Sequence, residues 1–599
     1  MRNIRIYSEV KEQGIFFKEV IQSVLEKANV EVVLVNSAML DYSDVSVISL
    51  IRNQKKFDLL VSEVRDKREI PIVMVEFSTA VTTDDHELQR ADAMFWAYKY
   101  KIPYLKISPM EKKSQTADDK FGGGRLLSVN DQIIHMYRTD GVMYHIEWES
   151  MDNSAYVKNA ELYPSCPDCA PELASLFRCL LETIEKCENI EDYYRILLDK
   201  LGKQKVAVKW GNFREEKTLE QWKHEKFDLL ERFSKSSSRM EYDKDKKELK
   251  IKVNRYGHAM DPERGILAFW KLVLGDEWKI VAEFQLQRKT LKGRQSYQSL
   301  FDEVSQEEKL MNIASEIIKN GNVISPDKAI EIHKLATSST MISTIDLGTP
   351  ERKYITDDSL KGYLQHGLIT NIYKNLLYYV DEIRFTDLQR KTIASLTWNK
   401  EIVNDYYKSL MDQLLDKNLR VLPLTSIKNI SEDLITWSSK EILINLGYKI
   451  LAASYPEAQG DRCILVGPTG KKTERKFIDL IAISPKSKGV ILLECKDKLS
   501  KSKDDCEKMN DLLNHNYDKV TKLINVLNIN NYNYNNIIYT GVAGLIGRKN
   551  VDNLPVDFVI KFKYDAKNLK LNWEINSDIL GKHSGSFSME DVAVVRKRS

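Results

Sequence analysis

Two apolar stretches near the C-terminal end of the 599-residue chain decide its fold: residues 476–483 read KFIDLIAI and residues 489–496 read GVILLECK. Both have the length and the aliphatic composition of buried strands, and the Pro, Lys, Ser and Gly residues between them are turn formers. Side chains alternate across a strand, so Glu494 and Lys496 are expected on one face and Cys495 on the other. The pattern therefore predicts a hairpin that gathers two carboxylates and an ammonium.

The three charged side chains of this hairpin have the chemistry of a metal-dependent hydrolytic site. Asp479 and Glu494 offer hard carboxylate oxygens of the kind that Mg²⁺ prefers, and the metal can keep several waters. The Lys496 ammonium can orient a water for attack on phosphorus or stabilise the developing negative charge. The simplest alternative is an ordinary hairpin with charged surface residues. The four-residue aliphatic run before Glu494, and the second strand that carries Asp479, favour a site.

The spacing of these residues resembles that of a known family. Asp479, fourteen intervening residues and then Glu494, Cys495 and Lys496 resemble the PD-(D/E)xK nuclease superfamily, which includes most type II restriction endonucleases and Holliday-junction resolvases. The proline that commonly precedes the first Asp in this family is Ile478 here. The resemblance implies a Mg²⁺-dependent nuclease in which Asp479 and Glu494 bind the metal and Lys496 assists the attacking water.

The segments around the hairpin complete an α-β-β-β-α-β order, which the nuclease family has in its core. A helix is predicted over 432–446 and ends at a glycine, a strand over 448–451, an amphipathic helix over 504–527 and a buried strand over 536–543. Some family members use a Glu of the first helix as a further metal ligand. Glu441 is the candidate and Glu432 the reserve, with a solvated helix charge as the alternative for either residue.

The N-terminal region repeats this order with one change. Strands are predicted over 31–35, 57–61, 70–78 and 103–108, with helices before the first strand and over 84–98. Asp58 and Glu76 correspond to the two metal-binding carboxylates, but Ser78 stands where the family has Lys. A hydroxyl cannot supply a positive charge, so a displaced Lys could serve instead. An active nuclease, a degenerate nuclease fold used for binding and an unrelated α/β unit remain the three alternatives.

Candidate DNA contacts lie in two polar segments. Residues 200–300 interleave basic and aromatic residues, among them Trp222 followed by a lysine and Trp270 followed by another, and 255–265 form a polar turn. The predicted DNA-binding residues are Arg255, His258 and Arg264 in this turn, and Gln89 and Arg90 at the start of the 84–98 helix. The alternatives are helix capping and the ordinary composition of an exposed α/β surface.

Length, charge and cysteine usage limit the class of protein. A chain of 599 residues is too long for one core, and a formal net charge of +3 requires that any DNA-binding face be a local patch. The chain has no run of eighteen apolar residues and no signal-peptide core at its N-terminus, so no membrane partner is expected. Seven scattered cysteines fit a reducing compartment, and the expected location is the cytoplasm.

Together these observations predict a mixed α/β (α+β) chain. Two restriction-endonuclease-like cores, each a mixed sheet flanked by helices, occupy 1–150 and 426–599, with a DNA-recognition region at 151–341 and a helical connector at 342–425 between them. The family resemblance implies cleavage of double-stranded DNA at or near a specific sequence, one core per strand, by a monomer or a transient dimer on DNA. Such a chain would resemble some type IIS restriction endonucleases.

Three other functions remain open at the level of the sequence. The first is an antiphage defence nuclease that a ligand or partner gates, in which the first 340 residues sense rather than cut. The second is a nicking endonuclease whose N-terminal core is inactive. The third is a non-catalytic DNA-binding or assembly protein, which the complete set of Asp479, Glu494 and Lys496 disfavours.

Overall fold

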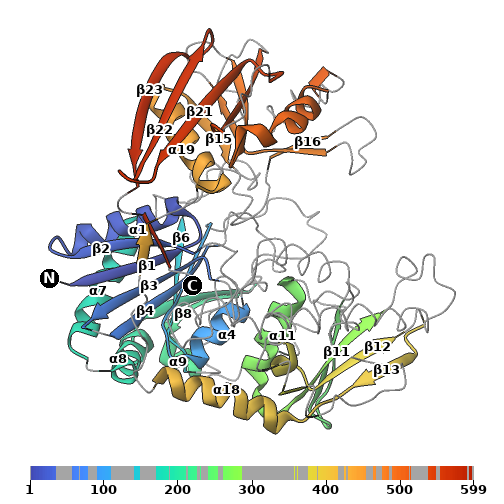
Figure 1. Ribbon diagram of the computed structural model, residues 1–599. Helices are drawn as coiled ribbons and strands as arrows, with labels where there is room; N and C mark the ends of the chain where they lie inside the picture. Colours follow the sequence, from blue (N-terminus) through green and yellow to red (C-terminus); the bar gives the residue numbers. More distant parts are fainter. Residues whose placement is uncertain are drawn as a thin grey trace.

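A computed structural model of the chain shows helices and strands following one another along the sequence, with the strands assembled into several sheets (Figure 1). The residues it describes are 2–35, 57–66, 68–77, 91–109, 140–148, 170–187, 189–210, 213–224, 230, 240–253, 261–285, 357, 360–361, 364, 376–386, 389–415, 424–426, 430–453, 463–466, 475–483, 489–511, 513–514, 537–547, 554–589 and 592–595. Within these ranges the strands form sheets of eight, seven and five strands and two of two strands, which confirms the predicted mixed α/β class. No helix in these ranges is both long enough and apolar enough to cross a membrane.

The eight-stranded sheet is built mainly from the first 150 residues. Its strands, in spatial order, are β14 (Leu424–Ser426), β24 (Val592–Val595), β2 (Asn29–Leu34), β1 (Asn3–Ser8), β3 (Leu59–Arg65), β4 (Arg68–Phe77), β5 (Tyr104–Pro109) and β6 (Met143–Trp148). Neighbours β1, β3 and β4 are antiparallel, whereas β4, β5 and β6 run parallel. Helices α1 (Lys11–Val24) and α7 (Ala170–Glu185) cover one face, and α4 (Ala91–Lys99) covers the other.

Strand β1 is the main feature of this sheet that the sequence patterns did not predict. It lies between β2 and β3 and pairs with both, so the predicted strand at 31–35 is not next to β3. Ile4 and Ile6 are buried on the side of α1, whereas Tyr7 is buried on the side of α4. Its sequence, NIRIYS, alternates polar and apolar residues from Asn3 to Ile6, which is the pattern of a half-exposed strand, although Arg5 is buried as well.

The seven-stranded sheet contains the predicted hairpin of residues 476–496. Its strands, in spatial order, are β15 (Lys449–Ala453), β18 (Leu480–Ile483), β19 (Val490–Lys496), β20 (Ile538–Leu545), β21 (Phe558–Asp565), β22 (Lys570–Ser577) and β23 (Gly581–Ser588). Helix α19 (Glu432–Asn445), which confirms the helix predicted over 432–446, packs on one face. The first two neighbouring pairs, β15 with β18 and β18 with β19, are antiparallel, and the next two, β19 with β20 and β20 with β21, are parallel. The strands β1, β3, β4, β5 and β6 of the eight-stranded sheet pair in the same series.

The five-stranded sheet lies in the middle of the chain and differs from the predicted division into regions. Its strands, in spatial order, are β13 (Thr392–Leu396), β12 (Glu382–Thr386), β11 (Lys279–Gln285), β10 (Glu248–Val253) and β9 (Met240–Asp243). Strands β12 and β13 belong to the stretch expected to be a helical connector, 342–425, of which α18 (Lys400–Leu415) is a described helix. The sheet therefore joins segments on both sides of the boundary expected at 341.

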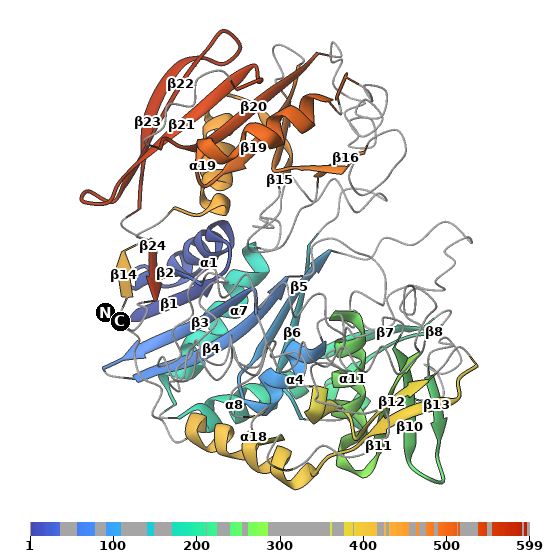
Figure 2. The ribbon, with the colours of Figure 1, turned by 45° about the vertical axis from the view of Figure 1, so that its right-hand side comes forward.

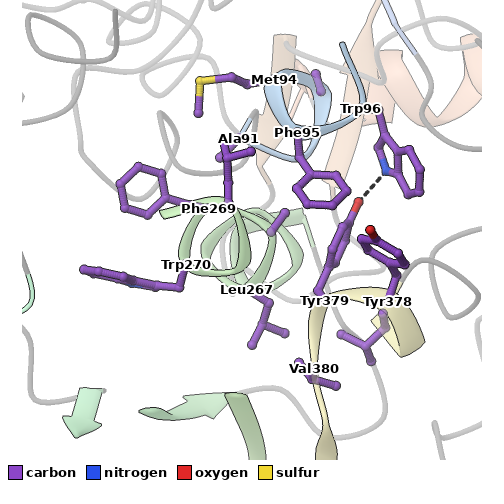
Figure 3. Close-up of a cluster of buried hydrophobic side chains, with 14 of the residues drawn as sticks. Ala91, Met94, Phe95, Trp96, Leu267, Phe269, Trp270, Tyr378, Tyr379 and Val380 are labelled. Atoms are coloured by element: carbon purple, nitrogen blue, oxygen red, sulfur yellow. Dashed lines mark hydrogen bonds between the residues drawn. The ribbon is translucent and has the colours of Figure 1, made fainter. Parts of the chain in front are cut away.

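Helix packing connects the eight-stranded sheet to the five-stranded one. Helix α4 lies against α11 (Asp261–Leu274), and the aromatic side chains around this contact form one buried cluster (Figure 3). In this cluster the Trp96 indole Nε1–H donates a hydrogen bond to the Tyr379 hydroxyl, and the ring of Phe95 meets that of Tyr379 edge to face. Three segments far apart in the sequence thus share a single core.

A second junction connects the eight-stranded sheet to the C-terminal one (Figures 1 and 2). The Lys11 ammonium of α1 lies 4.0 Å from the centre of the Trp437 ring of α19, and Glu12 forms an ion pair with Lys440. After β23 the chain returns to the first sheet, where β24 runs parallel to β2 and antiparallel to β14. The last described strand of the chain therefore belongs to the N-terminal sheet.

Removing the hydrogen bond between Trp96 and Tyr379 is expected to lower the free energy of unfolding by a measurable amount. Replacing Tyr379 with phenylalanine leaves the buried indole N–H without this acceptor, and an unsatisfied buried donor costs about 1–3 kcal/mol. We expect the free energy of unfolding of the Tyr379→Phe variant to fall by that amount in urea denaturation. Tyr242→Phe, at a half-buried position on β9, is the control and is expected to change it by less than about 0.5 kcal/mol. Equal stability of the two variants would contradict a structural role for the bond.

Candidate active site

Two buried carboxylates face each other at the end of the predicted hairpin. Asp479 lies between β17 (Arg475–Ile478) and β18, and Glu494 lies near the end of β19. The residue after Asp479 pairs with the residue before Glu494, so the two carboxylates are opposite each other on antiparallel strands. Each residue is only 2% exposed. The Cys495 N–H donates a hydrogen bond to Asp479 Oδ2 over 2.7 Å, which fixes the orientation of that carboxylate.

The alternation of side chains predicted for β19 is confirmed. Cys495 is fully buried in the core beneath α19, with Leu493 on the same side. Glu494 and Lys496 project from the other face, where the Lys496 Nζ lies 3.0 Å from Glu494 Oε1. The two strands thus bring together Asp479, Glu494 and Lys496, the three residues selected from the sequence.

The Lys496 ammonium is surrounded by negative charge. Besides Glu494 it contacts Glu432 Oε1 at 3.1 Å and Asp505 Oδ2 at 3.5 Å. Burial by itself would lower the pKa of Lys496, but the charges of Glu494 and then Glu432 outweigh burial and raise the pKa above its ordinary value. Lys496 therefore keeps its proton at neutral pH and acts as a fixed cation, not as a general base.

The close approach of the two carboxylates changes the acidity of Asp479. Burial raises the pKa of Asp479 well above its ordinary value, and the negative charge of Glu494 adds to this effect. The Cys495 N–H and the Lys496 ammonium act in the opposite direction but do not cancel it. A cation bound at the two carboxylates would offset both effects and favour the ionised form of Asp479.

The donor set at this site fits Mg²⁺, the metal that the family resemblance implies. Asp479 and Glu494 supply carboxylate oxygens, and Mg²⁺ is commonly bound by one or two carboxylates plus waters and substrate phosphates. Among the residues that the structure describes, no group of three or more His, Cys, Asp or Glu side chains is arranged to hold a metal ion. Asp479 and Glu494 would hold the metal from the protein side, and waters and substrate phosphates would supply its other ligands.

The helix residue at the site is Glu432, the reserve candidate of the sequence analysis. Glu432 follows the N-cap residue Ser431, so it stands at the end of α19 that approaches the last residues of β19. Glu441 lies nine residues further along α19, about 2.5 turns, which places it on the opposite side of the helix. The structure therefore brings Glu432 to Lys496 and does not bring Glu441 there. Asp505 is a further site residue that the sequence patterns did not single out.

Glu432 is expected to position Lys496, and this role can be measured. Outer-shell partners of a catalytic centre typically contribute about 10–100-fold to activity or metal affinity. The sequence resemblance implies Mg²⁺-dependent DNA cleavage, and for that reaction we expect Glu432→Gln to lower the rate within that range, because the amide cannot balance the ammonium charge. Glu441→Gln, on the other side of α19, is the matched control and should leave the rate unchanged. Equal rates for both variants would remove Glu432 from the site.

The N-terminal sheet contains a pair of carboxylates with the same local geometry. The Phe77 N–H donates to Asp58 Oδ2 over 2.7 Å, as the Cys495 N–H does to Asp479. The residue after Asp58 pairs with the residue before Glu76, again as in the C-terminal hairpin. Glu76 is 5% exposed and Asp58 is half-buried. Ser78, the third predicted residue of this site, lies outside the described residues.

The predicted DNA contacts are mostly outside the described part of the chain. This holds for Gln89, Arg90, Arg255 and His258, and for the side chain of Arg264 in α11. Two of the aromatic residues in the interleaved region are described and lie in the core, since Trp222 and Trp270 are almost fully buried. They belong to the apolar faces of α9 (Leu219–Lys223) and α11, so their spacing marks helix packing and not a DNA surface.

Comparison of the chain with models of protein families, with curated proteins and with solved structures gave no match in any of the three. The function is therefore inferred from the two carboxylate pairs and their surroundings. Their shared features are the antiparallel pairing of the two carboxylate-bearing strands and the backbone N–H that holds the Asp carboxylate.

Proposed function

We propose that the chain is a Mg²⁺-dependent endonuclease of the PD-(D/E)xK type that hydrolyses double-stranded DNA. The observation that carries the proposal is the convergence of Asp479, Glu494 and a Lys496 ammonium 3.0 Å from the Glu494 carboxylate. The series of strand pairings around this hairpin and the helix Glu beside Lys496 agree with the resemblance seen in the sequence.

The site residues have distinct tasks in this reaction. Mg²⁺ bound to Asp479 and Glu494 would act as a Lewis acid on a phosphate oxygen. Lys496 keeps its charge, so its ammonium can hold the attacking water and offset the negative charge that develops on phosphorus. The water oxygen bonds to phosphorus and loses a proton to solvent while the bond to the 3′-oxygen breaks. The 3′-oxygen takes a proton from solvent, which leaves a 5′-phosphate and a 3′-hydroxyl.

The second carboxylate pair supports a reaction in which each of two catalytic centres cuts one strand of the DNA. A duplex has antiparallel strands, and one active site ordinarily cuts one of them. Asp58 and Glu76 repeat the backbone geometry of Asp479 and Glu494 on a separate sheet of the same chain. Two centres in one chain would allow a monomer to cut both strands beside an asymmetric sequence, an arrangement that would resemble some type IIS restriction endonucleases.

Purified full-length protein, supercoiled plasmid and Mg²⁺ test this function. We expect discrete linear fragments with Mg²⁺ and none with EDTA, because the carboxylate pairs need the metal to act on phosphate. A single nicked product would show that only one centre is catalytic. Absence of cutting on plasmids of varied sequence, with Mg²⁺ or Mn²⁺, would contradict the proposal and favour a gated effector or a binding protein.

A further inference from the structure

A row of four polar residues crosses the eight-stranded sheet on adjacent strands. Asp58 precedes β3 and is opposite Glu76 on β4, since the residues next to them are paired. Glu76 pairs in turn with Lys106 on β5, and Lys106 pairs with His145 on β6. The row ends in a lysine and a histidine that the PD-(D/E)xK spacing did not point to.

All four residues project from the face of the sheet that α4 covers. The preceding row consists of Leu60, Met74, Tyr104 and Met143, which are paired with one another and belong to the core on that side. Asp58, Glu76, Lys106 and His145 are each two residues away along their strands. Because side chains alternate with a period of two, they share that face with the preceding row.

Lys106 is placed where it must be balanced by a carboxylate. It is 2% exposed, and a lysine is almost never buried to that extent unless it is paired. Its partner in register is Glu76, which is 5% exposed on a strand about 4.8 Å away. The register thus places Lys106 on the strand next to Glu76, opposite the residue that ends the predicted metal-binding pair of this sheet.

The C-terminal sheet shows the complementary arrangement. There the residue paired with Glu494 on the next parallel strand is Val542, which is fully buried and apolar. The lysine of the C-terminal centre, Lys496, comes from the same strand as Glu494, two residues further along the chain. In the N-terminal sheet that position is Ser78, and the lysine stands on the neighbouring strand instead. Each sheet therefore has one lysine beside its glutamate, provided by a different strand.

We propose that Lys106 is the catalytic cation of the N-terminal centre. It would take the role of the lysine that is absent at position 78, where this chain has a serine. This inference rests on the proposed nuclease function and names the residue that completes its second active site. Lys106 would offset the charge that develops on phosphorus when the second DNA strand is hydrolysed by the same exchange of bonds as at Lys496. Asp58 and Glu76 would be the metal ligands of this centre.

The test uses the full-length chain, Mg²⁺ and supercoiled plasmid, with Lys496→Ala to inactivate the C-terminal centre. We expect Lys496→Ala to nick the plasmid, and Lys106→Met combined with Lys496→Ala to lose that nicking by on the order of 10²-fold or more. Lys106→Met alone should accumulate nicks on the strand opposite to those of Lys496→Ala, as sequencing from the nicks would show. Lys101→Met, just before β5, is the control and should cut both strands at the native rate.

Two further measurements separate catalysis from folding. Nicking by Lys106→Met at the rate of the native C-terminal centre shows that the variant is folded. Ser78→Lys combined with Lys106→Val copies the C-terminal arrangement, so it should restore double-strand cutting. If Lys106→Met cuts both strands like the native chain while Lys496→Ala nicks, the role of Lys106 is refuted and the nuclease function stands. If the native chain does not cut DNA, both proposals fail.

Discussion

On the proposed nuclease function, replacing Lys496 with alanine is expected to give a variant that nicks plasmid DNA, where the native chain is expected to cut both strands. The C-terminal centre should lose on the order of 10²–10³-fold in rate, the range seen when a preorganised charge-stabilising donor is removed from an active site. The reason is specific to this geometry, because Lys496 is the one cation that contacts both Glu494 and Glu432 among the described residues. Plasmid cleavage followed over time by agarose gels measures the change.

The matched control for this prediction lies a few residues further along the chain. Lys501 forms an exposed ion pair with Asp497, and a pair of this kind contributes little to stability. Lys501→Ala should therefore cut both strands at the native rate. Undiminished double-strand cleavage by Lys496→Ala would show that the hairpin is not a nuclease site, whatever the N-terminal centre does.

The C-terminal site could be predicted from the sequence because its determinants are local. The aliphatic runs before Glu494 and around Asp479 specify two buried strands, and these strands pair antiparallel. The alternation along β19 then fixes which side chains face the site. Glu432 was harder to choose, since periodicity gives the faces of α19 but not which end approaches β19. Its position just after the N-cap Ser431 was the available signal.

Features that depend on contacts between distant segments could not be predicted in this way. Strand β12 joins the middle sheet next to β11, although residues 286–381 separate the two strands. Lys106 becomes a site candidate only through its register with Glu76, which no spacing in the sequence encodes. The surface position predicted for Trp270 is wrong for the same reason, because a Trp-Lys pair has the same sequence on an exposed surface and on a helix whose apolar face is buried.

Replacing Asp479 with asparagine is expected to have opposite effects on stability and on metal binding. In the native protein the pKa of Asp479 is raised by burial and by Glu494, so between the ordinary and the raised pKa the folded state holds a proton that the unfolded chain has lost. Stability therefore falls as pH rises through that window, and the full cost is present above it. Each unit by which the pKa of Asp479 is raised lowers the free energy of unfolding above that window by about 1.4 kcal/mol, and the neutral amide of the variant removes this loss.

In EDTA at neutral pH, Asp479→Asn should therefore unfold at a higher temperature than the native chain. The difference should disappear at about pH 3, below the ordinary pKa of an aspartate, where Asp479 is protonated in both states. With Mg²⁺ the order reverses, because a ligand at a hundred times its Kd stabilises the native protein by about 2.7 kcal/mol and the variant has lost a ligand. Asp578→Asn, at an exposed turn between β22 and β23, is the control and should behave as the native chain in both buffers. If the variant unfolds at a lower temperature than the native chain in EDTA, the Asp479 carboxylate does not destabilise the folded state. If Mg²⁺ raises the unfolding temperature of both proteins equally, Asp479 is not a metal ligand.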